Sequence, residues 1–580
     1  MSPTSIALEL AESRAAQFAD RTALCIKEGG AWQELTYAEL SRCARTLAAY
    51  LIESGLEAGD RAAILSESRP EWGIAFFGIV RAGAIVVPLD PKLGEIELAT
   101  ILADCAPKFL FVSAATKETA ERLKARIPAL AGLIALESRA AGPSCPWIAA
   151  LAPRAAHLPR ERRPGATVVI VYTSGTTGDP KGVMITDSNL VFEATRLEQV
   201  IDIGPGEAML SILPLNHLLE LTGGFLAILN QGGTVCYARS LFPQDLAELM
   251  RERSVKAMIG VPLLFKSLRG SLEREIRRAP LASRLAFHCA ALAAAFVPWR
   301  GARRLLFRSL HRRLGGRLQF FVSGGAPLDP EEARFFDRLG LPILQGYGLT
   351  ESSPVISVNT LKANKIGSVG RPLAQVEVMI DAAVALEDAS VVGDGEILTR
   401  GPHVMSGYYR REDLTRAVID PQGWLHTGDM GSLDADGFLY ITGRLRNLIV
   451  LGSGKKVYPE EVEAVLARSP SFREVCVLGR PSSGPVTEGG EVVCAVVVPA
   501  TGAPKDAEGT VDKSLEAEVH HMSLDLAAYK RPTHVFIHPA ELPKTASGKV
   551  KRLLIKQWLE RQELERRERE NHKRESEHAG

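Results

Sequence analysis

Hydrophobic and polar positions alternate with two different periods over most of the chain. Apolar residues recur three or four positions apart at 37–54 and 71–82, which predicts amphipathic helices. Short, mostly apolar runs lie between such segments and predict buried strands. These runs occupy residues 61–65, 84–88, 109–112, 166–172, 234–237, 257–260 and 318–322. Because strands and helices alternate, we expect an α/β fold with mostly parallel sheets and covering helices.

The pattern changes in the last third of the chain, where strand-like runs become shorter and Gly and Asp turns more frequent. A predicted helix at 459–467 and predicted strands at 474–478 and 491–498 indicate a further small unit. At 561–580, 12 of 20 residues are charged, six of each sign, which is typical of a frayed helix or a disordered tail. We therefore expect an N-terminal domain over 1–445, a small C-terminal domain over 446–556 and a charged tail over 557–580.

Composition and charge argue against several classes of protein. The 69 Lys and Arg residues nearly balance the 68 Asp and Glu residues, so the net charge is +1, without the basic excess typical of nucleic-acid-binding proteins. None of the eight cysteines forms a CxxC pair or has zinc-ligand spacing, which is typical of reduced thiols in a cytosolic protein. The first 18 residues carry acids where a signal peptide has its apolar centre. We therefore predict a cytoplasmic protein without a nucleic-acid partner.

One stretch raises the question of a membrane contact. No run reaches the roughly 18 consecutive apolar residues of a membrane span, and the nearest candidate, 285–299, is shorter and contains His288. The next segment, 300–317, holds seven Arg residues among Leu and Phe residues. This pattern predicts an amphipathic helix on the surface of the protein, and a peripheral contact with a lipid surface is the alternative.

A loop rich in Gly, Ser and Thr follows the predicted strand 166–172. It reads TSGTTGDPKG and contains a single lysine, Lys181. Such a loop presents backbone N–H groups and hydroxyls to an anion, and a nearby Lys adds positive charge. The Walker phosphate loop is excluded, because Gly175 and Gly178 are too close together and Lys181 precedes Gly182. A phosphate-binding loop of another kind and a plain polar turn both fit this segment.

Five motifs decide between these two interpretations. They are TSGTTGDPKG at 173–182, GYGLTE at 346–351, HTGD at 426–429, ITGR at 441–444 and PKTASGKVKR at 543–552. In this order they resemble the motifs of the adenylate-forming superfamily of acyl-CoA synthetases, adenylation domains and luciferases, and the resemblance runs from about Ile6 to Leu559. RPEW at 69–72, LPLNHLLE at 213–220 and FVSGGAPL at 321–328 are most similar to the long-chain fatty acyl-CoA synthetases.

The resemblance implies both a fold and a reaction. The fold has a large N-terminal domain, with two α/β-layered sheet subdomains and a small β-barrel-like subdomain, and a small, mobile α+β C-terminal domain. In the reaction, a fatty acid carboxylate attacks the α-phosphorus of ATP in the presence of Mg2+ and releases pyrophosphate, and the CoA thiol then displaces AMP. The protein contributes mainly positioning and charge neutralisation. The implied partners are a fatty acid, ATP and CoA, and the question of a homodimer is open.

Two other functions compete with that of a long-chain fatty acid–CoA ligase. A fatty acyl-AMP ligase, or a synthetase that forms acyl-(acyl carrier protein), loads a carrier protein instead of CoA. Such relatives carry an insertion, and no extra segment is evident between Arg371 and Arg444. A non-catalytic binding protein is expected to have lost one of four residues, all of which are present: Glu351, Asp429, Arg444 and Lys549. The sequence therefore favours the CoA ligase.

The resemblance also implies roles for single residues. Seven residues of the first motif would hold the β- and γ-phosphates: Thr173, Ser174, Gly175, Thr176, Thr177, Gly178 and Lys181. Seven others would line the adenine: Gly324, Gly325, Ala326, Gln345, Gly346, Tyr347 and Gly348. Thr350 would contact a phosphate and Glu351 would hold Mg2+, and both are assigned to the catalytic set. Asp429 would accept hydrogen bonds from the ribose hydroxyls with Arg444 beside it, and Tyr440 belongs to the same nucleotide-binding set.

Lys549 in the last motif is the implied catalytic residue of adenylation, because its ammonium would stabilise the charge that develops between the carboxylate and the α-phosphate. Its neighbours Lys551 and Arg552 are expected to be solvated. Arg446 takes the position of the hinge about which the C-terminal domain would rotate between the two half-reactions. The remaining assignments are Gly452 and Gly454 on the CoA side, and His217 and Phe225 in the acyl pocket.

Overall fold

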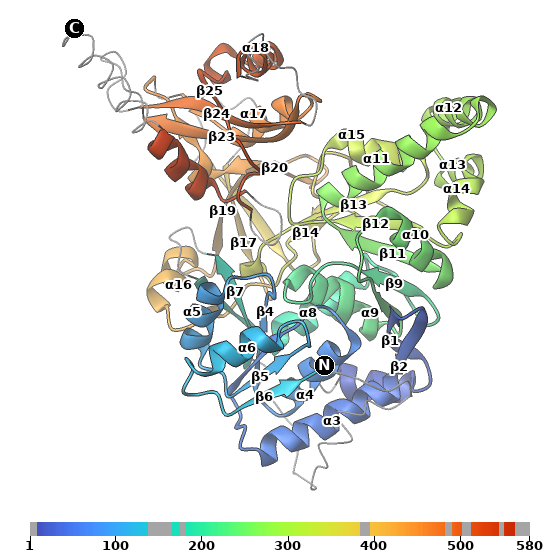
Figure 1. The fold of residues 1–580 in the computed structure, drawn as a ribbon, viewed down its shortest axis with the longest axis vertical. Helices are drawn as coiled ribbons and strands as arrows, with labels where there is room; N and C mark the ends of the chain where they lie inside the picture. The colour runs from blue at the N-terminus through green and yellow to red at the C-terminus, as the bar shows by residue number, and fades with distance from the viewer. Residues whose placement is uncertain are drawn as a thin grey trace, which may run out of the picture. The chain divides into compact units, whose positions relative to one another are not determined.

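The computed structural model describes residues 9–136, 165–174, 180–382, 395–453, 455–481, 490–500, 512–544 and 550–562. Their contacts divide the chain into two compact units. The N-terminal unit contains Met1–Val378, Thr399–Leu425 and Ala435–Leu439, and the C-terminal unit contains Met379–Leu398, His426–Asp434 and Tyr440–Gly580. Each unit has its own sheets and its own hydrophobic core (Figure 1).

A nine-stranded sheet forms one part of the N-terminal unit, in the order β15-β14-β13-β12-β11-β9-β10-β1-β2. Its central strands are parallel: β13 (Ile343–Tyr347), β12 (Phe320–Ser323), β11 (Val255–Gly260), β9 (Ala208–Ser211), β10 (Thr234–Tyr237) and β1 (Thr22–Glu28). The edge strands pair antiparallel: β14 (Ser357–Val358), β15 (Arg371–Pro372) and β2 (Ala31–Thr36). Every residue of β9, β11 and β12 is buried, as expected for parallel strands that are covered on both faces.

A seven-stranded sheet forms the other part, in the order β18-β8-β7-β4-β3-β5-β6. Five of its strands are parallel: β7 (Thr167–Ser174), β4 (Ile85–Leu89), β3 (Arg61–Leu65), β5 (Phe109–Val112) and β6 (Gly132–Ala135). The other two add antiparallel at one edge: β8 (Pro180–Thr186) and β18 (Gly407–Tyr408). The β7–β8 hairpin therefore carries both ends of the first motif.

The two large sheets bury one face each in a shared core. The helices of this core are α3 (Tyr37–Glu53), α4 (Pro70–Arg81), α8 (Asp187–Leu197), the π-helix η2 (Glu220–Leu226) and α9 (Ala227–Asn230). Because side chains alternate along a strand, Ile64 of β3 and Ile259 of β11 point into this core, whereas Leu65 and Met258 point to the opposite faces. The predicted alternation of helices and strands thus gives sheets with helices on both sides.

Other helices cover the outer faces of the two sheets. The outer face of the seven-stranded sheet packs on α5 (Glu95–Cys105) and α6 (Lys117–Lys124). The outer face of the nine-stranded sheet packs on α10 (Pro243–Glu252), α11 (Pro262–Arg278), α12 (Leu281–Phe296) and α15 (Pro330–Arg338). These layers confirm the expected α/β class.

The C-terminal unit is built on small sheets. The strands β16 (Glu377–Asp381), β17 (Gly395–Arg400), β19 (Leu425–Leu433) and β20 (Leu439–Arg444) form one sheet, most of which belongs to this unit. β21 (Ile449–Val450) pairs with β22 (Lys456–Val457). A third sheet contains β23 (Phe472–Pro481), β24 (Glu491–Pro499) and β25 (His534–Ile537), with α17 (Pro459–Leu466) and α18 (Asp512–Met522) in its core. The division of the chain at 445/446 stays a prediction.

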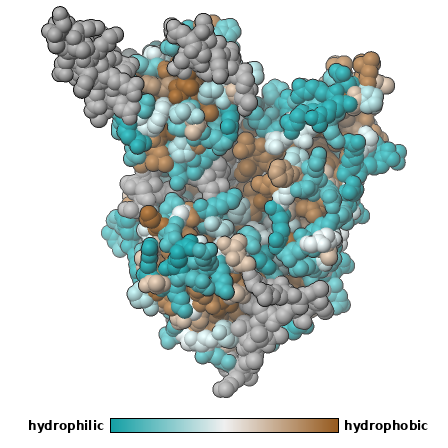
Figure 2. All heavy atoms as spheres, viewed as in Figure 1, coloured by the Kyte–Doolittle hydropathy of each residue, from teal (hydrophilic) through white to brown (hydrophobic). Residues whose placement is uncertain are grey.

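The segment 300–317 differs from the expected single helix. It forms two short helices, α13 (Arg300–Leu306) and α14 (Arg308–Arg313), separated by Phe307. Phe307 leaves the helical conformation, with φ −108° and ψ 30°, and packs its ring 5.3 Å from that of Phe287. Within the described ranges no helix is long and apolar enough to cross a membrane. On the face drawn in Figure 2, hydrophilic and hydrophobic side chains are interspersed.

Candidate active site

The parallel strands of the nine-stranded sheet bring several predicted site residues to one edge. His217 follows β9, Gly324–Ala326 follow β12, and Gln345–Tyr347 end β13. Because β9, β11, β12 and β13 are successive parallel strands, their carboxyl ends lie at the same edge, where open α/β sheets bind ligands. The segments also touch, since a Cβ on Gly324 would lie 2.8 Å from Cδ2 of Leu219. The two proposed adenine-lining segments are also neighbours, because Ser323 is opposite Gln345 in the parallel register of β12 and β13.

Two positions at this edge favour glycine, one because of its backbone conformation and the other because of close packing. Gly325 has φ +80°, a conformation that side chains rarely allow, and a Cβ there would have no neighbour within 4 Å. Gly348 is required by packing, because a Cβ would lie 1.8 Å from the carbonyl oxygen of Pro354. The open space beside Gly325 is consistent with the close approach of a flat ring to the backbone.

The first motif lies at the end of the β7–β8 hairpin. Thr173 is opposite Lys181 and Ser174 is opposite Pro180 in the antiparallel register. Gly182 fixes the start of β8, because a Cβ there would lie 2.8 Å from Cγ2 of Ile170. Lys181 is thus held beside Thr173 on a rigid pair of strands. The other predicted phosphate-binding residues of this motif lie outside the described ranges: Gly175, Thr176, Thr177 and Gly178.

Tyr408 connects Glu351 with Lys181. Its hydroxyl donates a hydrogen bond to Oε1 of Glu351 at 2.8 Å, and Nζ of Lys181 lies 5.5 Å from the centroid of its ring. Tyr408 reaches this position because β18 pairs with β8, where it is opposite Val183. The N–H of Met405 donates to the carbonyl oxygen of Glu351 at 2.9 Å and fixes its backbone. A cation, a carboxylate and a hydroxyl are thereby grouped, which suits a complex of a metal ion with phosphates.

The chemistry of Glu351 fits a magnesium ligand. Thr350 and Glu351 lie in the one-turn helix η3 (Thr350–Ser352) and are half-buried, so that a ligand can reach the carboxylate. Mg2+ prefers oxygen ligands and usually takes one or two carboxylates from a protein together with phosphate oxygens of the substrate. No group of three or more His, Cys, Asp or Glu side chains in the described part of the chain forms a metal site. A single carboxylate such as Glu351 fits Mg2+ in company with a polyphosphate.

In the C-terminal unit, Asp429 and Arg444 form an ion pair. Asp429 lies on β19 and Arg444 on the adjacent strand β20, and Nε of Arg444 is 2.7 Å from Oδ1 of Asp429. The Asp429 side chain is 4% exposed, and its N–H donates to Oγ1 of Thr427 at 3.1 Å. Tyr440 makes a different contact, because its hydroxyl donates to Oδ2 of Asp434 at 3.2 Å. The pair suits the binding of a vicinal diol, and the place of Tyr440 in the nucleotide-binding set stays a prediction.

The expectation that Arg552 is solvated is wrong. Its guanidinium binds both carboxylate oxygens of Glu463, at 2.7 and 2.8 Å, and also donates to the carbonyl oxygen of Val477. Burial alone lowers the pKa of Arg552, but the charge and hydrogen bonds of Glu463 outweigh it and hold this pKa above its ordinary value. Because α17 carries Glu463, the helix and the last motif are tied together by a half-buried ion pair.

Lys549 lies outside the described residues, whereas both flanks of its segment are described. Lys544 and Val550 form an antiparallel bridge, and the N–H of Lys551 donates to the carbonyl oxygen of Pro543 at 2.7 Å. Nζ of Lys544 also lies 2.8 Å from Oε1 of Glu474 on β23. The residues on either side of 545–549 are therefore fixed to the body of the C-terminal unit.

Arg446 and Gly452 have structural surroundings that the sequence did not indicate. Arg446 lies in a single turn of 3-10 helix, η5 (Leu445–Asn447), directly after β20. Gly452 is packed tightly against Gly490, where a Cβ would lie 2.1 Å from the Cα of Gly452. This close approach is a structural reason for a glycine at 490, and the role of Gly452 toward CoA stays a prediction. Gly454 lies outside the described ranges.

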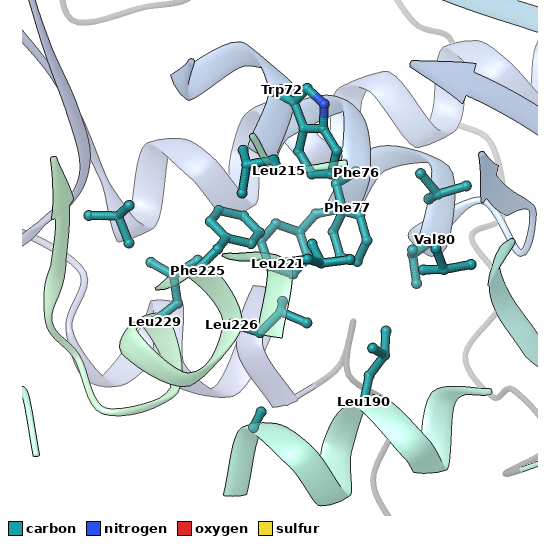
Figure 3. Close-up of a cluster of buried hydrophobic side chains, with 14 of the residues drawn as sticks. Trp72, Phe76, Phe77, Val80, Leu190, Leu215, Leu221, Phe225, Leu226 and Leu229 are labelled. Atoms are coloured by element: carbon teal, nitrogen blue, oxygen red, sulfur yellow. The ribbon is translucent and has the colours of Figure 1, made fainter. Parts of the chain in front are cut away.

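Phe225 lies in the shared core rather than at an evident surface. It is 0% exposed, and its ring centroid is 6.3 Å from that of Trp72, 6.1 Å from that of Phe76 and 5.6 Å from that of Phe77. Figure 3 shows these rings together, with Phe225 on η2 and the other three on α4. Packing explains why this position is aromatic, and a contact with the acyl chain stays a prediction.

The N-terminal unit thus has the architecture of an α/β enzyme with a ligand site at the carboxyl edge of a parallel sheet. Its Lys181–Tyr408–Glu351 group suits a polyphosphate and Mg2+. The fold and this group together are typical of enzymes that use a nucleoside triphosphate. Comparison with known families is specific: the chain belongs to the AMP-binding enzyme family, whose model matches residues 11–409. The model of the AMP-binding enzyme C-terminal domain matches residues 461–549.

Several known proteins are similar over most of their length. Long-chain-fatty-acid–CoA ligase FadD15 of Mycobacterium bovis is 32% identical over 478 residues, which cover 78% of this chain and 76% of that protein. Feruloyl-CoA synthase of an Amycolatopsis species is 32% identical over 537 residues, which cover 91% and 94%. The structure of o-succinylbenzoate CoA synthetase (MenE) from Bacillus subtilis with ATP and a magnesium ion has a TM-score of 0.72 at 27% identity, and the match covers 94% and 99%. The chain is an adenylate-forming acid–CoA ligase that uses ATP, Mg2+ and CoA.

Proposed function

We propose that this ligase activates a long-chain fatty acid, first as acyl-AMP and then as acyl-CoA. The observation that carries the adenylation step is the grouping of Lys181, Tyr408 and Glu351 at the end of the β7–β8 hairpin. The choice of acid is supported by three segments most similar to long-chain fatty acyl-CoA synthetases and by the similarity to FadD15. The similarity to a feruloyl-CoA synthase makes an aromatic acid the main competitor.

The segment that follows β9 supports an apolar acid. Residues 212–226 are apolar or Gly except for Asn216, His217, Glu220 and Thr222. Burial raises the pKa of Glu220 to about 8, so its side chain carries no charge at neutral pH. A substrate whose far end carries a hydroxyl needs a partner for it, because burial of an unpaired polar group is costly. A hydrocarbon chain has no such requirement and suits these surroundings better.

In the first half-reaction, a carboxylate oxygen of the acid forms a bond to the α-phosphorus of ATP while the bond from that phosphorus to the pyrophosphate oxygen breaks. Lys181 and Thr173 would bind the departing phosphates, and Mg2+ held by Glu351 would supply further positive charge when bound. Lys549 would stabilise the charge that develops on the oxygens around the α-phosphorus. Loss of such a cation costs on the order of 3–4 kcal/mol by analogy with lost oxyanion donors.

In the second half-reaction, the thiol sulfur of CoA forms a bond to the acyl carbon, and the bond from that carbon to the AMP oxygen breaks. The Asp429–Arg444 pair would keep the ribose hydroxyls in place, because a carboxylate acceptor suits two hydroxyl donors. Arg446 would act as the hinge between the two half-reactions, and Gly452 and Gly454 would border the CoA arm. Phe225 and His217 would border the acyl chain.

A substrate panel tests the proposal. Initial rates of pyrophosphate release and acyl-CoA formation are measured with ATP, Mg2+, CoA and palmitate, octanoate, ferulate or indoleacetate, with Glu351→Gln as the inactive control. We expect kcat/KM for palmitate to exceed that for ferulate by about tenfold or more, since each buried methylene favours the longer chain. The reverse order would disprove the long-chain assignment. Acyl-AMP that passes to an acyl carrier protein but never to CoA would show a carrier-loading enzyme instead.

A further inference from the structure

The helix α12 is apolar on both of its sides. Its inner side packs on the core under the nine-stranded sheet through Phe287, Ala290, Ala291 and Ala294. Its outer side exposes Leu281, Leu285, Leu292 and Phe296, with exposed fractions of 67%, 57%, 68% and 86%. These four residues are spaced by four, seven and four positions, so they lie on one stripe of the helix. A soluble helix normally turns a polar side outward, whereas α12 exposes this apolar stripe beside only a few polar residues, among them Arg284 and His288.

Two further exposed apolar residues follow the helix in the sequence. Trp299, just before α13, is 77% exposed, and Leu305 within α13 is 72% exposed. Figure 1 shows α12 at the outer end of the helices that cover the nine-stranded sheet, and Figure 2 shows apolar side chains there next to hydrophilic surface. We call these six residues the α12 surface: Leu281, Leu285, Leu292, Phe296, Trp299 and Leu305. Exposed apolar residues grouped in this way mark a binding surface rather than a random surface position.

The segment that contains the α12 surface carries charges of one sign. Residues 276–317 contain ten Arg and no Asp or Glu. Acids of the neighbouring helices pair with four of these arginines: Asp337 of α15 with Arg300 and Arg303, Glu273 of α11 with Arg277, and Glu275 of α11 with Arg313. Five exposed arginines of the segment have no ion pair within the described part of the chain: Arg278, Arg284, Arg308, Arg312 and Arg317. The same segment therefore carries the six exposed apolar residues and five exposed arginines.

We propose that the α12 surface docks this ligase onto a lipid bilayer that contains anionic headgroups. Apolar side chains of an interfacial helix enter the boundary between headgroups and acyl chains, and arginines beside it attract anionic lipids. A second copy of the chain would also cover the apolar stripe. It would, however, bring two arginine-rich segments, neither of which contains an acidic residue, close to each other, and like charges across an interface disfavour association. The bilayer satisfies both features of the surface.

Docking goes beyond the proposed substrate, and it is measured without any acid, ATP or CoA. The full-length protein is mixed with vesicles of phosphatidylcholine alone, or of phosphatidylcholine and phosphatidylglycerol in equal parts, and the bound fraction is determined by flotation. We expect binding only to the anionic vesicles at low salt, and weaker binding at high salt because salt screens the arginines. The protein without vesicles is sized in parallel by light scattering.

Two variants and a matched control test the surface. Leu285→Ser, Leu292→Ser and Phe296→Ser together should weaken binding to anionic vesicles by about tenfold or more, and Arg284→Gln, Arg308→Gln and Arg312→Gln together should remove the preference for anionic lipid. The control, Ile96→Ser with Leu524→Ser, changes two other exposed apolar residues (80% and 57% exposed) and should bind like the unchanged protein. All are exposed positions outside the proposed site, so pyrophosphate release with a water-soluble acid should persist.

Three results would overturn the proposal. The unchanged protein could fail to bind anionic vesicles, or the serine variant could bind them as well as the control does. The protein could also form a dimer in solution that the serine variant separates, which would make a second copy the occupant of the α12 surface. None of these three results would contradict the proposed long-chain substrate. Likewise, a preference for ferulate in the substrate panel would not contradict docking on a bilayer.

Discussion

Replacement of Arg552 by Met is expected to affect adenylation without touching any nucleotide-binding motif of the N-terminal unit. Arg552 holds both oxygens of Glu463 at 2.7 and 2.8 Å, and the two side chains are only 24% and 21% exposed. Arg552→Met keeps most of the aliphatic stem but removes the cation. Glu463, whose pKa burial already raises, is then left without its strongest partner.

The size of the effect follows from the burial of this ion pair. Removal of one partner of a buried pair typically costs about 3–5 kcal/mol. Because about a quarter of each side chain still reaches solvent, we expect a loss of about 2–3 kcal/mol in the stability of the C-terminal unit. Arg552 is three residues beyond Lys549, so the same change removes one anchor of the segment that carries the lysine. We expect acyl-AMP formation to slow roughly tenfold or more, as for a displaced catalytic group.

Separate measurements of the two half-reactions distinguish a loss of lysine positioning from a loss of folding stability. Acyl-AMP formation is measured in a single turnover with ATP and palmitate, and thioester formation is measured from supplied palmitoyl-AMP and CoA. We expect Arg552→Met to slow the first step and largely spare the second. Arg552→Lys keeps the charge but loses the bidentate geometry. Its rate of acyl-AMP formation should lie between that of Arg552→Met and that of the unchanged protein. Urea unfolding of each variant reports the loss of stability.

A matched control and a double variant decide the interpretation. Arg473 on β23 pairs with Glu541, and these side chains are 50% and 59% exposed, so Arg473→Met should change stability by less than about 1 kcal/mol and leave both steps intact. Glu463→Gln in the Arg552→Met protein removes the unpaired charge and should restore part of the stability without restoring acyl-AMP formation. Equal losses in both half-reactions, or recovery of the first step along with stability, would refute a positioning role for Arg552.

Three further predictions concern single residues. Lys549→Ala should slow acyl-AMP formation by roughly 100–1,000-fold and spare thioester formation from supplied acyl-AMP, and equal loss of both steps would contradict its role. Tyr408→Phe removes the hydrogen bond to Glu351 and should shift the Mg2+ titration of pyrophosphate release to higher concentrations, whereas an unchanged titration would show that this bond has no part in metal binding. Burial raises the pKa of Glu220 from 4.5 to about 8, because the folded state favours the protonated carboxyl. The stability that depends on this protonated form is complete below pH 4.5 and is lost as the pH rises through 8. Glu220→Gln should therefore stabilise the N-terminal unit by about 3 kcal/mol at pH 7 and by little at pH 4.5, and an equal gain in urea unfolding at both pH values would refute the buried carboxyl as the cause.

The parallel strands were predictable because they are buried on both faces. β3, β5 and β10 begin and end at the residues that the apolar runs 61–65, 109–112 and 234–237 indicate. Such strands read as continuous apolar segments, so their boundaries coincide with a change in polarity. The break between α13 and α14 was not predictable in this way. Helical periodicity continues through Phe307, whereas the structure ends the first helix there, with the ring of Phe307 packed on that of Phe287.

The site was predictable where a motif lies at a strand end and was missed where a partner comes from elsewhere in the chain. The glycines after β12 and β13 and the lysine of the β7–β8 hairpin belong to local patterns. Tyr408 is 57 positions from Glu351, and Arg552 is 89 positions from Glu463, and neither contact has a local signal. A sequence pattern shows which residue types the chemistry needs. The partners that hold those residues in place depend on the tertiary fold.

The ion pairs on either side of 545–549 bear on the rate of adenylation. Lys544 before the segment pairs with Glu474 of β23, and Arg552 after it pairs with Glu463 of α17. A flexible lysine side chain gains little rate from its charge alone, because positioning must be fixed before the reaction for the charge to lower the barrier. Two anionic anchors on different elements restrict both flanks of the segment at once. The rate of adenylation should therefore depend on α17 and β23, although neither element carries a residue with a proposed role in binding ATP.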